Sequence, residues 1–440
     1  MQEFNWKIGR PVQKNFVSPA VERVISEAEA KIPNKELYKL FSRAFPNTLD
    51  TTVKYTINSE GNHDTYVITG DIDAMWLRDS TAQVWPYLTL MKEDQSLKNL
   101  IAGVINRQAH YIRIDPYANA FNHGNDGSIW ERDNTKMKPE LHERKWEIDS
   151  LCYHVRLAYE YWKLTQDRGI FTNEWLNTAT LIYKTFKNQQ LKDGKYHYTF
   201  QRNTLVATDT LADHGLGNPI NPVGLIASAF RPSDDATVLP FLIPSNFFAI
   251  DTLNKIAEIL RLHYNAATLA RNCIKITLEI KHALNEYATA VHKKHGKILC
   301  YEVDGFGSHL FMDDANVPSL ISLPYLECID IKNKIYQNTR EFVLSNDNPW
   351  YFTGKSITGV GSIHTGRNRV WPIALIMQGL TAQTNLEVDD CLDMLLNSHD
   401  GSYFIHEAID KDNQSNYSRP WFAWANSLFA ELVIKRYKLI

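Results

Sequence analysis

The sequence has no excess of charge of either sign. It contains 47 Lys and Arg residues against 50 Asp and Glu residues, and its formal net charge is −3. Proteins that bind nucleic acid neutralise phosphates with surplus basic side chains, so this balance argues against a nucleic-acid partner. The sequence also lacks any run of about 18 apolar residues, the length that a transmembrane helix needs. We therefore expect no membrane partner.

A signal peptide is also missing from the sequence, because residues 1–13 have neither a basic start nor an apolar stretch. This predicts a cytoplasmic protein, or a periplasmic or secreted one if a signal peptide has been removed. Cysteines are few, widely scattered and never in CxxC spacing. This pattern excludes a disulfide framework and fits a reducing compartment. The five are Cys152, Cys273, Cys300, Cys328 and Cys391.

Motifs for metals and cofactors are absent as well. The sequence has no HExxH, no EF-hand loop and no clustered Cys and His residues. No Walker motif or dinucleotide-binding glycine pattern occurs either. We expect neither a metal nor a cofactor. What the sequence does have is aromatic residues, 12% of the chain, with 11 Trp, 21 Tyr and 19 Phe. They predict a large core, a cleft whose rings stack on a ligand, or both.

Helical periodicity dominates the chain and is of two kinds. Segments with one apolar face predict helices that cover a core. Between them lie helices that are apolar nearly all round and should be buried on every side. The one-sided helices are expected at 19–31, 97–112, 173–190, 265–285, 333–345 and 385–398. The buried helices are expected to start, each with a capping signal, near Ser80, Ser150, Ser245, Ser319, Trp371 and Pro420.

Six buried helices alternating with six one-sided helices predict an all-α fold, an (α/α)6 barrel with an inner and an outer ring. A single catalytic domain would then span residues 1–440. A helical solenoid is the alternative, but the spacing between buried helices is too irregular for a repeat unit. Long loops precede the inner helices, so one face of the barrel should carry the function. Short β-hairpins are expected in these loops, for example Val53–Ile57 with 66–69.

The first long loop contains the string GDIDAMWLRDS at 70–80. Trp76 offers a ring for stacking, while Arg78 and Asp79 offer donors and acceptors for sugar hydroxyls. Asp79 is also expected to cap a helix. In the second loop, Asn125 and Asp126 are either turn formers or ligand contacts. Trp146 lies at the entrance to the next buried helix and is likewise either part of a turn or a ligand contact.

Carboxylates mark two further loops. Asp234 and Asp235 are adjacent within an otherwise apolar stretch, where one carboxyl is expected to have a raised pKa and to stay protonated as a general acid. Glu407 lies between aromatic residues and the last buried helix. The third and sixth inner helices of a six-membered ring lie opposite each other. The Asp pair and Glu407 would therefore flank a bound sugar, as glycoside hydrolysis requires.

The segments together resemble glycoside hydrolase family 125, the bacterial and fungal exo-α-1,6-mannosidases. The resemblance rests on strings that span nearly the whole chain in order. These are GDIDAMWLRDSTAQVWPY (70–87), KWEIDSLCY (145–153), FRPSDDA (230–236), IPSNFFA (243–249), HTGRNRVWPIALIMQGLT (364–381) and HEAIDKDNQSNYSRPWFAWANSLFAEL (406–432).

This resemblance implies an (α/α)6 fold and a metal-independent, inverting exo-α-1,6-mannosidase. Such an enzyme removes the terminal non-reducing mannose from α-mannosides or N-glycan fragments, so its partner is a mannose-containing oligosaccharide. The general acid falls on Asp234 or Asp235, and the general base on Glu407. We expect a monomer or a weak oligomer. The resemblance implies mannose contacts from Arg78 and Asp79, and further contacts from Trp76, Arg231, His364, Arg367 and Trp371.

Two other functions remain as alternatives. The first is a sugar 2-epimerase or isomerase on the same barrel, which would use paired histidines as acid and base. The second is a glycan-binding protein that keeps the pocket but has no turnover. The carboxylates at Asp234, Asp235 and Glu407 favour hydrolysis over both.

Overall fold

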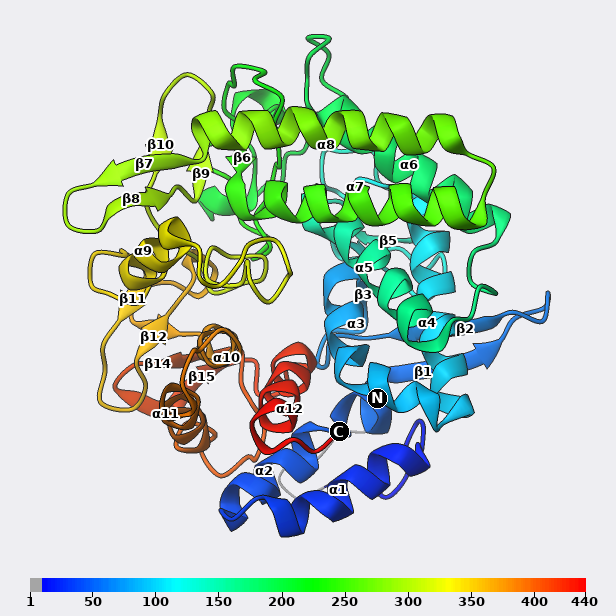
Figure 1. Cartoon of the computed structure of the whole chain (residues 1–440), viewed down its shortest axis with the longest axis vertical. Helices are drawn as coiled ribbons and strands as arrows, with labels where there is room; N and C mark the ends of the chain where they lie inside the picture. The colour runs from blue at the N-terminus through cyan, green and yellow to red at the C-terminus, as the bar shows by residue number, and fades with distance from the viewer. Residues whose placement is uncertain (1–9) are drawn as a thin grey trace.

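The computed structural model describes residues 10–440. Residues 1–9, part of the stretch considered above for a signal peptide, lie outside the described residues. The described part is rich in helix and contains twelve α-helices (Figure 1). Their bounds are α1 Pro19–Lys31, α2 Lys35–Ala44, α3 Leu77–Val84, α4 Gln95–Ile114, α5 Ile148–Thr165, α6 Asn173–Gln189, α7 Ile243–His263, α8 Ala267–Tyr287, α9 Lys334–Val343, α10 Pro372–Leu380, α11 Asn385–Leu396 and α12 Ala423–Tyr437.

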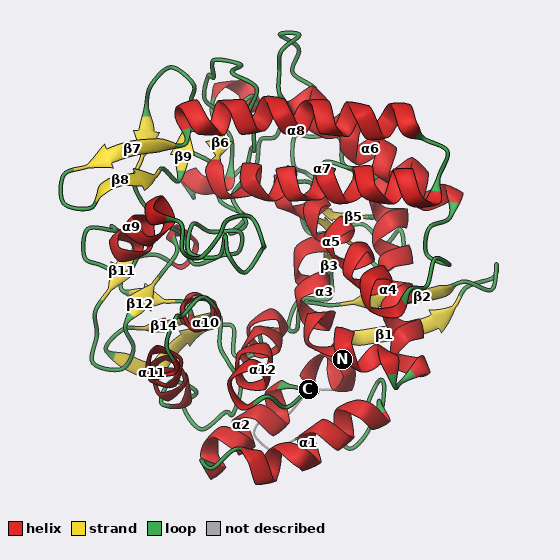
Figure 2. Cartoon of the chain, viewed as in Figure 1, coloured by secondary structure: helices red, strands yellow, loops and turns green. Residues whose placement is uncertain are grey.

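Short antiparallel strands occupy the loops between these helices (Figure 2). They form small sheets of two or three strands each. The strands are β1 Val53–Ile57, β2 His63–Val67, β3 Met75–Trp76, β4 Ala120–Phe121, β5 Leu141–Glu143, β6 Phe241–Leu242, β7 Thr289–His292, β8 Gly296–Leu299, β9 Glu302–Val303, β10 His309–Leu310, β11 Tyr351–Phe352, β12 Gly359–Val360, β13 Arg369–Val370, β14 Ala408–Asp410 and β15 Asn413–Ser418. The expected hairpin at Val53–Ile57 is confirmed, although its second strand begins earlier, at His63.

The alternation of helix types is largely confirmed. The six expected one-sided helices are α1, α4, α6, α8, α9 and α11, with ends within two residues of the expected ones. Five of the six expected buried helices are also present, as α3, α5, α7, α10 and α12. The short helix α2 was not expected from the sequence. It packs its apolar residues Leu37, Leu40 and Phe41 against α12 and α1.

The expected start signals of the buried helices are confirmed only in part. Pro244 and Pro372 lie in the first turns of α7 and α10, as expected, but each of the five helices begins without a side-chain hydrogen bond from its N-cap residue. The reason is that short strands lead directly into several of them, so strand pairing already fixes the backbone. For example, β3 ends at Trp76, the N-cap of α3, and β6 ends at Leu242, the N-cap of α7. Asp79 is therefore the third residue of α3 and not its cap.

The helix expected near Ser319 is also wrong, because residues 319–328 form a series of turns. Pro324 within this segment has no backbone N–H to donate to a helix. The buried Asp313 carboxylate instead accepts hydrogen bonds from the N–H groups of Leu320 (2.8 Å) and Ile321 (3.1 Å). Burial raises the pKa of Asp313 to about 8. The Asp313 side chain thus organises the buried backbone of this segment.

The buried helices form a chain of neighbours around the centre of the molecule (Figure 1). In order, α10 packs on α12, α12 on α3, α3 on α5, and α5 on α7. The turn segment 319–328 bridges two members of this series, α5 and α12. Arg156 of α5 donates to the Tyr325 carbonyl (3.3 Å), and the Tyr325 hydroxyl donates to Glu431 of α12 (3.0 Å).

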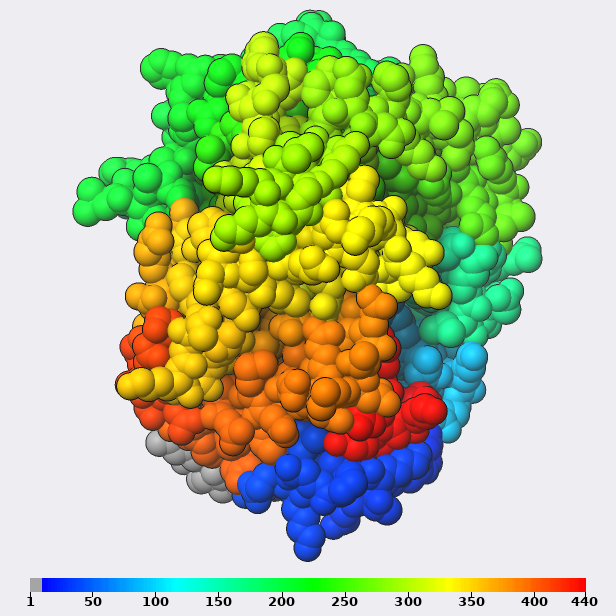
Figure 3. All heavy atoms as spheres, turned by 60° about the vertical axis from the view of Figure 1, so that its left-hand side comes forward, coloured from blue at the N-terminus to red at the C-terminus, as the bar shows by residue number. Residues whose placement is uncertain are grey.

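The ends of the described chain meet on one side of the molecule. In Figure 3 the N-terminal helices (blue) lie directly below the C-terminal helix (red), in agreement with the packing of α2 on α12. Many aromatic side chains are buried, and Trp146, Trp175 and Trp424 are among the largest of these. No helix within residues 10–440 is both long and apolar enough to cross a membrane.

Candidate active site

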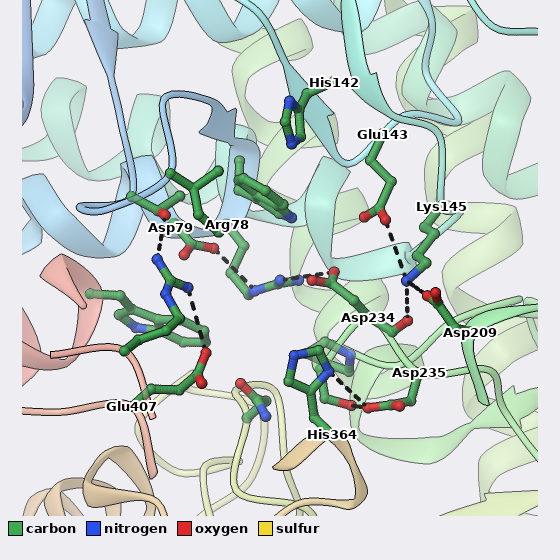
Figure 4. Close-up of a pocket in the computed structure, with 18 of the residues that line it drawn as sticks. Arg78, Asp79, His142, Glu143, Lys145, Asp209, Asp234, Asp235, His364 and Glu407 are labelled. Carbon is green, nitrogen blue, oxygen red and sulfur yellow. Dashed lines mark hydrogen bonds and ion pairs between the residues drawn. The ribbon is translucent and has the colours of Figure 1, made fainter. Parts of the chain in front are cut away.

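A cavity of about 470 Å³ opens where the loops before α3, α5, α7, α10 and α12 converge (Figure 4). Rings, carboxyls and basic groups line it together, which is the composition expected of a sugar-binding pocket. Eight of the residues singled out in the sequence lie on its wall. They are Trp76, Arg78, Asp79, Asp234, Asp235, His364, Trp371 and Glu407.

Arg78, in the first turn of α3, is buried among carboxyls. Its Nη1 atom donates to Glu147 (2.7 Å) and to Asp149 (3.2 Å), both at the start of α5. Its Nη2 atom lies 3.6 Å from Asp234, and its Nε atom lies 3.5 Å from Asp79. One guanidinium thus serves four carboxyl groups, and it ties the walls formed by α3, α5 and the loop before α7 together.

Burial changes the titration of three of these carboxyls. It raises the pKa of Asp79 to about 6 and that of Asp149 to about 6, although Arg78 acts in the opposite direction. Burial also raises the pKa of Glu147 well above its usual range, and the charge of Asp234 adds to this effect. These carboxyls therefore keep their protons to a higher pH than exposed carboxyls do.

Asp234 is the member of the aspartate pair that faces the cavity, since 21% of its side chain is exposed against 6% for Asp235. It occupies a left-handed backbone position with φ of 66°. Its Oδ1 atom accepts a hydrogen bond from Asn119 (3.1 Å), and its carbonyl accepts one from the Lys145 Nζ atom (2.7 Å). Burial opposes ionisation, but Arg78 and Lys145 outweigh it and hold the pKa of Asp234 at about 2.

Asp235 instead pairs with His364. The Nδ1 atom of His364 lies 3.4 Å from the Asp235 carboxylate, which also accepts a hydrogen bond from Ser233 (2.8 Å). Burial opposes protonation of the imidazole, but the hydrogen bond and the charge of Asp235 raise the pKa of His364 to about 9. Against burial, His364 lowers the pKa of Asp235. The expectation that Asp234 or Asp235 has a raised pKa is therefore wrong, because each carboxylate faces a cation.

Glu407 lies on the other side of the cavity from the aspartate pair (Figure 4). Its Oε2 atom accepts a hydrogen bond from Ser418 (2.8 Å), and its Oε1 atom lies 3.5 Å from the Arg419 guanidinium. Arg419 is in turn held by Asp71 (2.8 Å) and Thr69 (2.9 Å), which precede α3. Loops from the beginning and the end of the chain therefore fix this carboxylate together.

Three tryptophans shape the rest of the wall. The Trp76 ring packs at 5.4 Å from the His142 ring, and its Nε1 atom has no partner among the described residues. Trp371 donates its Nε1 hydrogen to Thr365 (2.8 Å). Trp424 lies 5.5 Å from the Arg78 guanidinium. These rings enclose the polar groups and exclude bulk water from them.

Five of the predicted site residues do not line the cavity. Trp146 is 1% exposed and belongs to the core, where its Nε1 atom donates to the Ala227 carbonyl (2.8 Å). Arg231 is buried on the far side of its loop, where it donates to Glu302 (2.6 Å) and anchors the segment that carries the aspartate pair. Asn125 and Asp126 are exposed in a turn, and Arg367 is exposed above Trp350. Turn formation and core packing explain these residues.

A second group of cavity residues was missed from the sequence. Lys145 donates to Asp209 (2.6 Å), and Arg202 bonds both Asp209 (3.0 Å) and Glu143 (2.9 Å). These residues join the loop at 190–240 to the wall beside Asp234. Lys145 lies directly before the WEIDS string, so that string was a signal for it. Arg202 and Asp209 lie in a loop without any distinctive motif, and nothing in the sequence pointed to them.

The positions of the histidines do not suit a reaction that uses a pair of them as acid and base. Of the described residues that line the cavity, only His142 and His364 are histidines. His154 is buried beside Gln108 in the core, and burial lowers its pKa to about 3. His406 is stacked on Tyr417, and burial lowers its pKa to about 4. Within residues 10–440, no group of three or more His, Cys, Asp or Glu side chains is arranged to hold a metal ion.

Comparison with known proteins agrees with this site. The model of the metal-independent α-mannosidases (GH125) matches residues 34–434. The meiotically up-regulated gene 157 protein of Schizosaccharomyces pombe is 41% identical over 439 residues, which cover 96% of this chain and 86% of that protein. A metal-independent α-mannosidase of Streptococcus pneumoniae, solved as a non-productive complex with α-1,6-mannobiose, has a TM-score of 0.92 and 38% identity, covering 96% of this chain and 99% of that one.

A more distant likeness concerns the fold alone. A solved variant of another glycosidase has a TM-score of 0.53 at 10% identity and covers 92% of this chain and 98% of its own. The family match and the two close relatives each extend over nearly all of the sequence. The chain belongs to glycoside hydrolase family 125, the metal-independent α-mannosidases.

Proposed function

We propose that this protein is an inverting exo-α-1,6-mannosidase that removes the terminal non-reducing mannose from α-mannosides and N-glycan fragments. The observation that carries the proposal is the placement of Asp234 and Glu407 on opposite sides of one cavity. Two carboxyls that flank a sugar supply the acid and the base of glycoside hydrolysis. The α-1,6-mannobiose bound to the S. pneumoniae relative supports the choice of linkage.

The scaffold in this proposal is a single (α/α)6 catalytic domain spanning residues 1–440. Its inner ring consists of α3, α5, α7, α10 and α12, with the turn segment 319–328 in the place of the fourth inner helix. The order of neighbours from α10 through α12, α3 and α5 to α7 supports this assignment. Because one chain supplies the described lining of the cavity, a monomer or weak oligomer is sufficient for activity.

In the proposed reaction, Asp234 donates a proton to the glycosidic oxygen as the bond from that oxygen to the anomeric carbon breaks. Glu407 takes one proton from a water molecule whose oxygen bonds to the anomeric carbon from the opposite face. The products are the shortened oligosaccharide and mannose with the inverted, β configuration. Asp234 is preferred over Asp235 as the acid because Asp235 is occupied by His364 and is less exposed to the cavity.

The remaining wall residues bind the terminal mannose. Arg78 and Asp79 supply donors and acceptors for hydroxyl groups, as does the protonated His364 imidazole. Trp76 and Trp371 offer aromatic surface for the apolar face of the sugar. A volume of about 470 Å³ suits a small saccharide and not a long polymer groove, which supports exo action.

The test is hydrolysis of α-1,6-mannobiose followed by proton NMR from the first seconds of reaction. We expect β-mannose to form first and to convert slowly to the α anomer. Formation of α-mannose first would contradict inversion. The α-1,2- and α-1,3-linked disaccharides serve as comparison substrates, and equal rates on all three would contradict the proposed linkage preference.

The two alternatives predict different outcomes in the same assay. A 2-epimerase or isomerase would convert free mannose and leave the disaccharide intact, whereas a glycan-binding protein would bind the disaccharide without turnover. The pairing of His364 with Asp235, and the location of His154 and His406 away from the cavity, do not favour the epimerase. Release of reducing sugar from α-1,6-mannobiose excludes both alternatives.

A further inference from the structure

Glu147 is a buried carboxyl near Asp234, the proposed acid, and the proposed reaction gives it no role. It is the N-cap residue of α5 and is 0% exposed. Its Oε2 atom accepts hydrogen bonds from Arg78 (2.7 Å) and Ser150 (2.9 Å). Its Oε1 atom is buried and receives no donor from the described residues. A buried carboxylate oxygen without a donor is costly, which points to a protonated group.

The second observation is that Glu147 and Asp234 face the same guanidinium: Arg78 Nη1 lies 2.7 Å from Glu147, and Arg78 Nη2 lies 3.6 Å from Asp234. Two carboxylates held against one guanidinium repel each other and only accept hydrogen bonds, whereas one proton shared between them removes the repulsion and lets one carboxyl donate. The charge around Arg78 favours the same, since its single positive charge faces Asp79, Glu147, Asp149 and Asp234. Even with Lys145, which also stabilises ionised Asp234, two cations would face four buried carboxylates.

We propose that Glu147 and Asp234 share one proton and that this pair, and not Asp234 alone, is the acid unit of the enzyme. Glu147 does not line the cavity and acts through Asp234, so it is a positioning residue. This inference rests on the proposed function, in which Asp234 is the acid. It explains how Asp234 carries a proton although Arg78 and Lys145 stabilise its ionised form.

The proton has two positions in this scheme. In the resting enzyme it lies on Glu147 and is donated to the Asp234 carboxylate. A bound mannoside displaces water from Asp234, which makes the neutral form of that carboxyl more favourable. The proton then lies on Asp234 while Glu147 is ionised beside Arg78. Transfer to the glycosidic oxygen leaves both carboxyls ionised, and after product release one proton from solvent restores the pair.

The substitution Glu147→Gln tests the pair. The glutamine keeps the shape of the side chain and carries no acidic proton. Asp234 then titrates alone between Arg78 and Lys145, so the basic limb of kcat/KM should move down by about one pH unit or more. On α-1,6-mannobiose the rate at pH 7 should fall about tenfold or more, because each pH unit above the limb costs a factor of about ten.

The dependence of the rate on the leaving group distinguishes proton sharing by Glu147 from a purely structural role of this residue. Dinitrophenyl α-mannoside leaves as a weakly basic phenolate and needs little acid assistance, so Glu147→Gln should keep most of the wild-type rate on it. Glu431→Gln is the matched control, since Glu431 is a buried carboxyl on α12 whose pKa burial raises to about 7, and it lies outside the cavity. This control should leave the pH profile unchanged.

Two results would overturn the proposal. One is an unchanged basic limb in Glu147→Gln. The other is an equal loss on both substrates with an unchanged pH profile, which would show that Glu147 only holds Arg78 in place. If the variant does not fold, the pH profile of the wild-type enzyme still tests the proposal, because a shared proton places its basic limb well above the ordinary range of a carboxyl. A basic limb near pH 4, the ordinary range of a carboxyl, would also overturn the pair. Failure of the wild type to hydrolyse any mannoside would instead contradict the proposed function.

Discussion

At the scale of single residues, Glu407 is the side chain whose removal should separate binding from turnover. Glu407→Gln keeps an acceptor for Ser418 and loses only the ability to take a proton from water. We expect hydrolysis of α-1,6-mannobiose to fall by about 10²-fold to 10⁴-fold or more, with little change in affinity measured by calorimetry. Ser418→Ala is the control and should reduce turnover far less. Near wild-type turnover in Glu407→Gln would remove this residue from the role of base.

The two adjacent aspartates should respond differently to the same change. Asp234→Asn removes the group that faces the cavity and should abolish turnover of α-1,6-mannobiose while sparing dinitrophenyl α-mannoside. Asp235→Asn removes the partner of His364 and should slow both substrates to a similar degree. Steady-state rates on the two substrates distinguish these patterns. If Asp235→Asn shows the selective loss, the assignment of the acid is reversed.

The ion pair of His364 with Asp235 should make stability depend on pH in the alkaline range. The pKa of His364 is raised from 6.5 to about 9 in the folded protein. Its contribution to stability is therefore complete below pH 6.5 and is lost as the pH rises towards 9. Because 38% of the ring is exposed, solvent weakens the pair and the effect is modest. Thermal unfolding should show a steeper fall in Tm between pH 7 and 9 for wild type than for His364→Asn, and parallel curves would contradict this.

Composition and local patterns were enough to predict that Arg78, Asp234 and Glu407 lie at the cavity, because polar groups among aromatic and apolar residues are unusual in a loop. The same reasoning failed for Trp146 and Arg231, although the residues around them in the sequence are of the same kinds. Their side chains turn away from the cavity, Trp146 towards Ala227 and Arg231 towards Glu302. Side-chain direction depends on the backbone of the loop, and a string of residue types does not specify it.

At the scale of elements, the loop before α3 and the loop before α12 are joined at Gly70. This residue pairs with Phe422 and has φ of 119°. A Cβ atom there would lie 2.5 Å from the Trp421 carbonyl oxygen. Gly70→Ala should therefore cost about 2 kcal/mol or more of stability and lower kcat/KM, because both walls of the cavity move.

Gly61→Ala is the matched control for this element. Gly61 also has a positive φ, of 81°, but a Cβ atom there meets nothing within 4 Å. It should cost only the conformational penalty of about 1 kcal/mol and leave kcat/KM unchanged. Urea unfolding and steady-state kinetics measure both quantities. Equal effects of the two substitutions would show that the contact with Trp421 does not matter.

Most elements were predictable because their periodicity agrees with their burial. The exception at 319–328 shows the limit of this reasoning. Its apolar residues are buried as expected, but Pro324 and the Asp313 carboxylate favour turns over a helix. Burial and helix formation are separate properties, and an apolar run reports only the first. The helix starts were misjudged for a related reason, since the strands before them leave no need for a Ser or Asp cap.

At the scale of the whole molecule, Tyr325 bridges two of the buried helices, α5 and α12. Tyr325→Phe removes the donor to the buried Glu431 carboxyl and should cost about 1–3 kcal/mol of unfolding free energy. Residue 325 is not part of the cavity wall, so kcat/KM below the unfolding temperature should remain at the wild-type value. Urea unfolding at pH 8 is the measurement. Unchanged stability would mean that the turn segment does not hold these helices together.

Part of the site could not be predicted from the sequence, because its residues come from segments that lie far apart along the chain. Arg202 and Asp209 come from the loop at 190–240, and they meet Lys145 only through the packing of that loop against the start of α5. No spacing rule connects them. Residues next to an unusual string can be found by reading along the chain, whereas residues that approach only in three dimensions cannot.

The pairing of Arg419 with Asp71, and of Phe422 with Gly70, has a consequence for synthesis. A chain still being translated contains Arg78 and Asp234 long before the ribosome has added Glu407 and Arg419. Such a nascent chain holds the proposed acid but has neither the proposed base nor the side chain that positions it. Under the proposed function, the protein therefore hydrolyses no mannoside until the loop before α12 has been translated and has joined the loop before α3.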